Sequence, residues 1–280
     1  MSKALVLGGG GMAGIAWITG LLHGLAEGGQ DVTDVDLIVG TSAGATVAAQ
    51  LGSRLALQEL YARQVHEGRQ AAEIMGNVDL DNFGANLKAV LNGVTGFQET
   101  RRVLGQFAIE AETVPEAARR EVIESRLPSH EWPTGLTLKL VAVDAKSGDL
   151  QVFHNDSGVD LVDAVHASCA VPGLWPPVTI GGRQYVDGAA RSNTSADLAA
   201  GASQALVIAP LGRTELFPCE KPLDAAINEL RNGGTEVLVV EPDTASLAAI
   251  GRNPADPSTR RPAAEAGRAQ GRRLSDSQLA

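Results

Sequence analysis

A serine between two glycines, placed where a short apolar strand meets a helix, constrains this chain more than any other feature. Residues 40–44 read GTSAG, after the apolar run 37–39 and before the helix-forming run 45–51. Small residues allow the backbone to turn tightly from strand to helix, which leaves the Ser42 side chain on the outside of the turn. This G-x-S-x-G pattern, with Gly40 and Gly44 in supporting positions, is typical of a nucleophile, although an ordinary Gly/Ser turn has the same letters.

Apolar, β-rich runs alternate with helical stretches along the whole chain. This alternation predicts an α/β fold of three layers, in which a mainly parallel central sheet is flanked by helices. One domain is expected over residues 1–250, because a chain of 280 residues does not require two. The expected strands are 3–8, 36–40, 136–143, 150–154, 204–209 and 235–240.

Two segments depart from this alternation. Residues 54–132 have a helical period and no strong strand pattern, so we expect a helical cap inserted into the domain. Glycines interrupt the part of the cap at 68–98, which is typical of a mobile lid. Its apolar residues are Ile74, Met75, Phe83, Leu87 and Phe97.

The arginine-rich residues 251–280 are expected to form a basic, partly disordered C-terminal tail. Within it, residues 263–274 are expected to form a solvated terminal helix. Contact of this tail with anionic lipid headgroups is the alternative interpretation.

Charge and cysteine content narrow the classes of partner. The formal net charge of −10 argues against nucleic acid, because phosphate backbones are bound by clustered Lys and Arg. Cys169 and Cys219 form no C-x-x-C pair, so neither a disulfide framework nor a zinc site is indicated. The sequence has no signal-peptide pattern and no run of about 18 apolar residues. We therefore expect a cytoplasmic protein that can contact the membrane peripherally; no oligomeric state is indicated.

The glycine-rich opening of the chain fits two chemistries. A strand-like run at 3–7 is followed by four glycines and then by the helix-forming run 15–25. In a dinucleotide-binding fold, Gly9, Gly11 and Gly14 would complete G-x-G-x-x-G, and the helix N-terminus would hold a pyrophosphate. In an acyl-transfer enzyme, the main-chain N–H groups of the glycines would instead bind an oxyanion.

The second strand favours the oxyanion interpretation. A dinucleotide site needs an acidic residue at the end of that strand to hold the ribose hydroxyls. Asp34 and Asp36 precede the strand at 37–39, and the strand ends in the serine turn. A nucleotide-binding oxidoreductase of the Rossmann type therefore remains only an alternative.

A serine hydroxyl needs a base within hydrogen-bond reach, and the usual base is histidine. The order of an α/β-hydrolase triad would be met only by His166 with Asp144 or Asp149. His166 lies within an expected helix, where a packed histidine is the more common role.

Asp187 is the other candidate base. It ends a short strand-like run at 184–187 and is followed by Gly188. Asp-Gly is also a common turn pair. A carboxylate in this position could accept the serine proton directly, which would make a Ser/Asp dyad with no imidazole.

Three motifs together resemble the patatin-like phospholipase family of bacterial lipid acyl hydrolases. They are GGGGMAG at 8–14, GTSAG at 40–44 and DGA at 187–189, and the segment SCAVPGLWPP at 168–177 also resembles that family. The resemblance spans about residues 3–210 and implies the patatin-like form of the α/β fold described above.

The resemblance also implies roles for individual residues. Ser42 would attack a lipid or fatty acyl ester, and Asp187 would act as general base and then as general acid. Main-chain N–H groups around Gly9, Gly10 and Gly11 would bind the oxyanion, and water would hydrolyse the acyl-enzyme. No metal or cofactor is implied.

One position departs from the family pattern. Family members commonly have Arg or Lys before the last glycine of the loop, where this chain has Ala13. Without that charge the oxyanion has less stabilisation, so a catalytically weak lipid-binding or scaffold protein of the same fold is an alternative function. Trp17, on the helix that follows, is a candidate for the acyl pocket or for the core.

Overall fold

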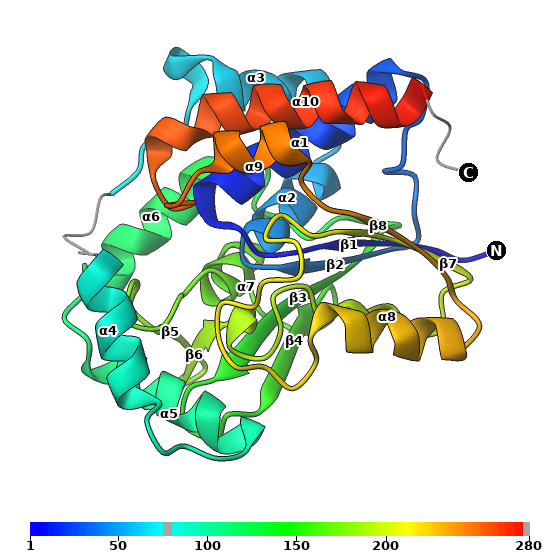
Figure 1. Cartoon of the computed structure of the whole chain (residues 1–280). Helices are drawn as coiled ribbons and strands as arrows, with labels where there is room; N and C mark the ends of the chain where they lie inside the picture. Colours follow the sequence, from blue (N-terminus) through cyan, green and yellow to red (C-terminus); the bar gives the residue numbers. More distant parts are fainter. Residues whose placement is uncertain (75–79, 277–280) are drawn as a thin grey trace.

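A single twisted sheet organises the chain in the computed structural model, which describes residues 1–74 and 80–276 (Figure 1). Its eight strands are β1 (Lys3–Leu7), β2 (Leu37–Thr41), β3 (Thr137–Asp144), β4 (Leu150–His154), β5 (Val178–Ile180), β6 (Arg183–Asp187), β7 (Gln204–Ile208) and β8 (Glu236–Val240). Strands β3, β2, β1, β7 and β8 are neighbours in that order and parallel. The short strands β4, β5 and β6 pair antiparallel. The expectation of a mainly parallel α/β sheet is confirmed.

Helices cover both faces of this sheet. They are α1 (Gly11–Glu27), α2 (Ala43–Gly52), α3 (Leu57–Val65), α4 (Leu80–Val90), α5 (Phe97–Glu110), α6 (Glu116–Arg126), α7 (Leu161–Ser168), α8 (Leu223–Asn232), α9 (Thr244–Ile250) and α10 (Arg260–Asp276). Figure 1 shows α1, α2, α9 and α10 on one side of the sheet and α8 on the other. The structure therefore has the three expected layers.

Side-chain alternation along the strands explains this arrangement. Leu5 and Leu7 of β1 join the large apolar cluster that contains residues of α1, α2 and α7. Ala4 and Val6 point to the opposite face, where they join a second cluster with α8. Successive residues of a strand face opposite sides of the sheet, so an almost wholly apolar strand has helices packed on both faces.

The segment expected to be a helical cap contains α3 to α6 and, within the described residues, no strand. Of the expected lid residues, Phe83 lines the cavity described below and Leu87 packs beside a third apolar cluster, while Phe97 is half exposed. Met75 lies outside the described residues. Movement of this segment stays a prediction.

The C-terminal segment corrects the expectation of a partly disordered tail. Residues 260–276 form helix α10, which lies alongside α1 and buries one face against it (Figure 1). A Cβ on Gly24 of α1 would overlap the carbonyl oxygen of Arg268, and one on Gly267 of α10 would overlap that of Trp17. Glycines on both helices therefore allow the two backbones to touch. A helix was expected here, but the expectation that it is solvated was wrong, because one of its faces is buried.

Candidate active site

Ser42 lies on a strained turn between β2 and α2. Its backbone angles are φ 54° and ψ −115°, in a region that residues with a side chain rarely adopt. A Cβ on Gly44 would overlap the carbonyl oxygen of Leu7, and one on Gly40 would lie 2.7 Å from Cα of Ala45. Both supporting glycines are therefore required by close approach of the helix to the sheet. This is the strand–turn–helix context that a nucleophile elbow needs.

Two residues from the end of α7 hold the turn in place. The hydroxyl of Ser168 accepts a hydrogen bond from the Ser42 N–H at 3.0 Å and donates to the Val141 carbonyl at 2.6 Å. The thiol of Cys169 donates to the Ser42 carbonyl at 3.2 Å. Sequence analysis noted this segment only as a resemblance. The structure gives it a physical role, because it ties the strained turn to strand β3.

Asp187 reaches the same place through the register of β3. Thr41, the last residue of β2, pairs with Val141, and Asp187, the last residue of β6, pairs with the next residue, Ala142. Strand β4 occupies the opposite edge of β3, so β2 and β6 follow one another along one edge. The two strands meet end to end. Ser42, which follows β2, and Asp187, which ends β6, are therefore brought together.

The carboxyl group of Asp187 is fully buried. Its Oδ1 accepts the Ala189 N–H at 2.8 Å, and a Cβ on Gly188 would lie 2.5 Å from the Val141 carbonyl oxygen. Burial raises the pKa of Asp187 to about 7, against the lowering effect of hydrogen bonds from Ala189 and from the Ser42 side chain. The Ser42 contact is loose, since Oδ2 has no partner within strict hydrogen-bond limits in the described part of the chain.

The glycine loop offers fewer free donors than expected. The Gly9 N–H already donates to the Asn193 carbonyl at 2.8 Å. The expectation that Gly9 donates to the oxyanion is therefore wrong. Within residues 1–74 and 80–276, the N–H groups of Gly10 and Gly11 have no hydrogen-bond partner. Both lie at the start of α1, whose N-terminus favours negative charge. Gly10 and Gly11 are therefore the available donors.

The departure at position 13 is a buried alanine. The Ala13 side chain brings no charge to the loop, and its N–H donates to the Pro254 carbonyl at 2.9 Å. Trp17, one turn further along α1, is fully buried in the main apolar cluster. Of its two expected roles, packing in the core is the correct one.

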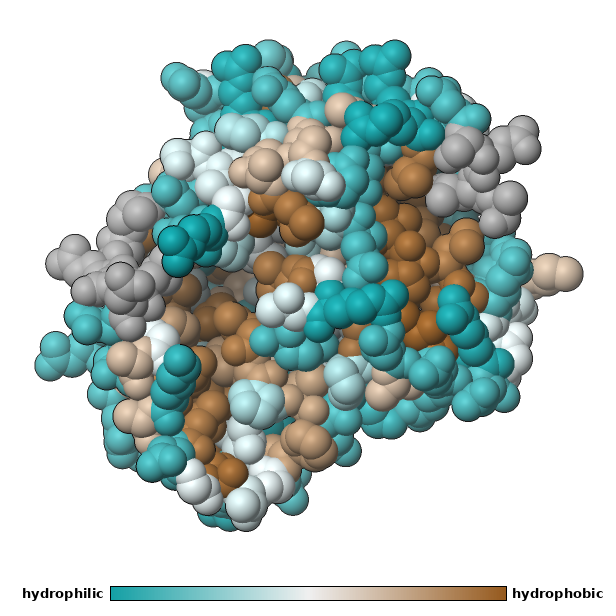
Figure 2. Space-filling model, viewed as in Figure 1, coloured by the Kyte–Doolittle hydropathy of each residue, from teal (hydrophilic) through white to brown (hydrophobic). Residues whose placement is uncertain are grey.

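A cavity of about 300 Å³ opens over Ser42 and the glycine loop. Ile15, Leu174 and Leu216 contribute to its mostly apolar wall. Hydrophobic side chains also gather in a hollow of the face drawn in Figure 2. Arg119 and Arg126 line the cavity as well, and sequence analysis did not identify them. Their signal was present, because they share the buried face of α6 with Val122 and Ile123.

The histidine alternative is not supported. His166 is buried, and neither of its ring nitrogens has a hydrogen-bond partner among the described residues. Burial lowers its pKa to about 3, helped by nearby arginines, so the ring is neutral. Asp144 accepts N–H groups of its own turn and pairs with Arg183, and Asp149 accepts from Gln98. Among the described residues, no carboxylate hydrogen-bonds to His166.

The nucleotide alternative also lacks its acidic residue. Asp34 and Asp36 are exposed and lie before β2, at the opposite end of the strand from the glycine loop. The Asp36 carboxylate instead accepts the Lys3 N–H at 2.8 Å. It therefore cannot hold a ribose at the carboxyl end of the sheet.

The described residues contain no group of three or more His, Cys, Asp or Glu arranged to hold a metal ion. None of their helices is both long and apolar enough to cross a membrane.

Comparisons with known proteins place this geometry in a family. The family model for patatin-like phospholipase matches residues 5–200. A comparison with curated proteins gave no match.

The solved structures that are similar at low identity include VipD and ExoU. VipD from Legionella pneumophila is 14% identical, with 99% of this chain and 67% of that chain covered and a TM-score of 0.48. The type III effector ExoU is 14% identical, with 99% and 54% covered and a TM-score of 0.39. ExoU from Pseudomonas aeruginosa in complex with SpcU is 17% identical, with 100% and 53% covered and a TM-score of 0.39. The chain thus spans about two thirds of VipD and about half of ExoU, and the sequence match alone carries the family assignment.

Proposed function

Because the chain belongs to the patatin-like phospholipase family of ester hydrolases, we propose that it is a serine-dependent lipid acyl hydrolase of the phospholipase A or carboxylesterase type. One observation carries the proposal. Ser42, on a strained turn, lies beside the buried carboxyl group of Asp187 and also lines an apolar cavity. A nucleophile, a base and an acyl-sized space therefore meet at one point.

The reaction begins with the ionised carboxylate of Asp187. It accepts the proton of the Ser42 hydroxyl while the Ser42 oxygen attacks the ester carbonyl carbon. Negative charge moves onto the carbonyl oxygen, where the N–H groups of Gly10 and Gly11 receive it. Collapse of this intermediate breaks the bond to the alcohol, which takes the proton from Asp187 and leaves an acyl group on Ser42.

Water completes the cycle. The carboxylate of Asp187 accepts a proton from water as the water oxygen attacks the acyl-enzyme. The second intermediate then releases the fatty acid, and the proton returns to Ser42. A pKa of about 7 suits Asp187 for both directions of transfer, because a group near the working pH gives and accepts protons readily.

The lining of the cavity supports a fatty acyl chain as the bound group. Leu174, Trp175 and Leu216 present apolar surface beside Ser42, and Leu216 is partly exposed. Removing a flexible acyl chain from water onto such a wall supplies affinity without polar contacts. The proposal includes peripheral contact with a membrane, because a fatty acyl chain would enter the cavity from the membrane.

A labelling experiment tests the proposal. A fluorophosphonate probe should attach to Ser42, identified by peptide mapping, and p-nitrophenyl octanoate should be hydrolysed. Ser42→Ala should abolish both, whereas Ser2→Ala, an exposed serine at the other end of β1, should leave both unchanged. Equal hydrolysis by the native protein and by Ser42→Ala would refute the enzyme and favour a lipid-binding protein of the same fold.

A further inference from the structure

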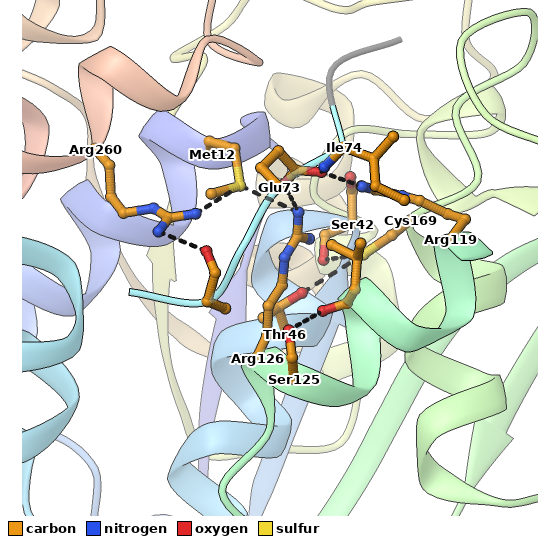
Figure 3. A network of polar contacts seen from close by, with 12 residues as sticks. Met12, Ser42, Thr46, Glu73, Ile74, Arg119, Ser125, Arg126, Cys169 and Arg260 are labelled. Carbon is orange, nitrogen blue, oxygen red and sulfur yellow. Dashed lines mark hydrogen bonds and ion pairs between the residues drawn. The ribbon is translucent and has the colours of Figure 1, made fainter. Parts of the chain in front are cut away.

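Three arginine side chains converge on one carboxylate beside the proposed active site. Arg119 and Arg126 of α6 both form ion pairs with Glu73 (Figure 3). Arg260 of α10 contacts the sulfur of Met12, which Arg126 also contacts. The three arginines are only 3%, 6% and 4% exposed, respectively. Arginine is almost never buried to this degree unless it is paired.

The pairing in this cluster is incomplete. Glu73 is the sole acidic partner of Arg119 and Arg126 among the described residues, and Arg260 has no acidic partner there. The Nε atoms of all three arginines lack a hydrogen-bond partner in the described part of the chain. Other contacts carry no negative charge: Arg119 stacks over the Trp175 ring, and Arg126 and Arg260 touch the Met12 sulfur. Among the described residues, three positive charges therefore share one negative charge.

The titration of the group agrees with this excess. Burial and the like charge of Arg126 lower the pKa of Arg119 to about 10, which still leaves it protonated at neutral pH. Burial alone would raise the pKa of Glu73, but the charges and hydrogen bonds of Arg126 and Arg119 outweigh it and lower the pKa. Glu73 is therefore ionised, and the described residues of the cluster carry a net positive charge.

The position of the cluster links it to the reaction. Glu73, Arg119 and Arg126 line the same cavity as Ser42 and the glycine loop. Glu73 lies in the non-helical stretch 70–74, whereas the two arginines are fixed on α6. The backbone that carries the Glu73 carboxylate is therefore less constrained than the helix that carries the two arginines. A molecule that places an ester at Ser42 could place a negative group where Glu73 now sits.

We propose that Arg119 and Arg126 bind the phosphate group of the lipid substrate, and that the Glu73 carboxylate occupies this site until the lipid displaces it. This inference rests on the proposed function and narrows its substrates to phospholipids. Guanidinium groups match the oxygens of a phosphate in pairs, and a phosphodiester offers two anionic oxygens to satisfy two arginines. The nearby charge of Arg260 favours the exchange further.

Binding can be measured without turnover in the Ser42→Ala background. Tryptophan fluorescence provides the signal, because Arg119 stacks on Trp175, and Trp175→Phe checks its source. The ligands are dihexanoylphosphatidylcholine, dihexanoylglycerol, which has the same acyl esters and no phosphate, and inorganic phosphate. The variants are Glu73→Gln, the triple change Glu73→Leu with Arg119→Met and Arg126→Met, and Arg120→Met. Arg120 is the matched control, because it lies on the same helix but pairs outside the cavity with Asp163 and Glu124.

Glu73→Gln should lower the Kd for the phospholipid relative to that for the diacylglycerol by about tenfold, because the internal anion is gone. The triple variant should raise the same ratio by about tenfold or more, and Arg120→Met should leave it unchanged. The triple variant replaces Glu73, Arg119 and Arg126 together, so that none of the three leaves a partner buried with an unpaired charge. If the triple variant does not fold, the response of Glu73→Gln decides.

Two results would overturn the inference. One is a Kd ratio that does not respond to Glu73→Gln; the other is binding of inorganic phosphate with no preference for the phospholipid, which would point to a free anion. Neither result affects the proposed function, since labelling and hydrolysis at Ser42 are measured separately. Conversely, an inactive protein that shows the expected Kd changes would refute only the hydrolase.

Discussion

The hydroxyl of Ser168 accepts a hydrogen bond from the main-chain N–H of Ser42 and donates one to strand β3. Ser168→Ala leaves that buried N–H unpaired, which should cost about 1–3 kcal/mol of the free energy of unfolding. It should lower kcat more than it changes KM, because the strained turn then shifts. Ser157 is the matched control: its hydroxyl also bridges main-chain groups, of His154, but in a turn outside the site. Equal effects of the two changes on kcat would contradict the role of Ser168.

The pKa of Asp187 predicts the pH dependence of hydrolysis. The reaction needs the ionised carboxylate, so kcat/KM should rise tenfold per pH unit below about pH 7 and level off above it. Rates of p-nitrophenyl ester hydrolysis measured between about pH 5 and about pH 9 check this. A profile that is flat through neutral pH would exclude Asp187 as the base.

The same shift predicts an effect on stability. The folded pKa lies above the unfolded value of 3.8, so the folded state binds more protons between these values and stability falls as the pH rises toward 7. Asp187→Asn cannot ionise and should be more stable than the native protein above pH 7, by up to about 4 kcal/mol, while hydrolysis is lost. Asp144→Asn should do the opposite at neutral pH, because hydrogen bonds from Ser147 and Lys146, together with Arg183, lower the pKa of Asp144 despite its burial. Thermal unfolding at acidic and at neutral pH measures both.

Substitutions in the glycine loop distinguish its donors. A Cβ on Gly10 would lie 2.7 Å from Cβ of Pro210, so Gly10→Ala should displace its free N–H and lower kcat by about 100-fold. A Cβ on Gly9 would meet its nearest atom, Cβ of Ser42, at 3.4 Å, an ordinary contact, and the Gly9 N–H is already bonded. Gly9→Ala should therefore cost much less. A larger loss of kcat in Gly9→Ala than in Gly10→Ala would mean that the donors are wrongly assigned.

Because α10 packs closely on α1, a Gly→Ala change at this contact should destabilise the protein, whereas the same change in an open helix should stabilise it. Gly24→Ala places a methyl group against the Arg268 carbonyl and should destabilise the protein by about 2–3 kcal/mol. Gly84→Ala, in α4, meets no atom of the described residues within 4 Å and should stabilise the protein by about 0.5–1 kcal/mol. Denaturant unfolding of the two variants tests this. Similar stability in both would show that α10 does not press on α1.

Local sequence signals predicted the parts of this structure that are set locally. The expected strands at 150–154 and 204–209 agree with β4 and β7 within a residue. The turn at Ser42 was also predictable, since only small residues fit it. By contrast, β5 has three residues and was missed, because so short a strand has no detectable period.

Features that depend on distant pairing were not predictable. The pairing of Ser42 with Asp187 was inferred from the place of Asp187 at a strand end and from family resemblance. Its structural cause is the register of β2 and β6 on β3, which no single segment encodes. The bond that removes Gly9 from the donors comes from Asn193, far along the chain. The basic composition of 251–280 suggested solvation, while Gly267 and Gly271, four residues apart, carried the packing signal that was overlooked.

The end-to-end meeting of β2 and β6 has a consequence for how such a protein can change over generations. The backbone of β3 sets the distance between the ends of β2 and β6, and Ser168 and Cys169 hold the turn that carries Ser42. The walls that choose the ester come from other segments, including α6 and the stretch around Glu73. Selection can therefore remodel what enters the cavity while the spacing between Ser42 and Asp187 is kept.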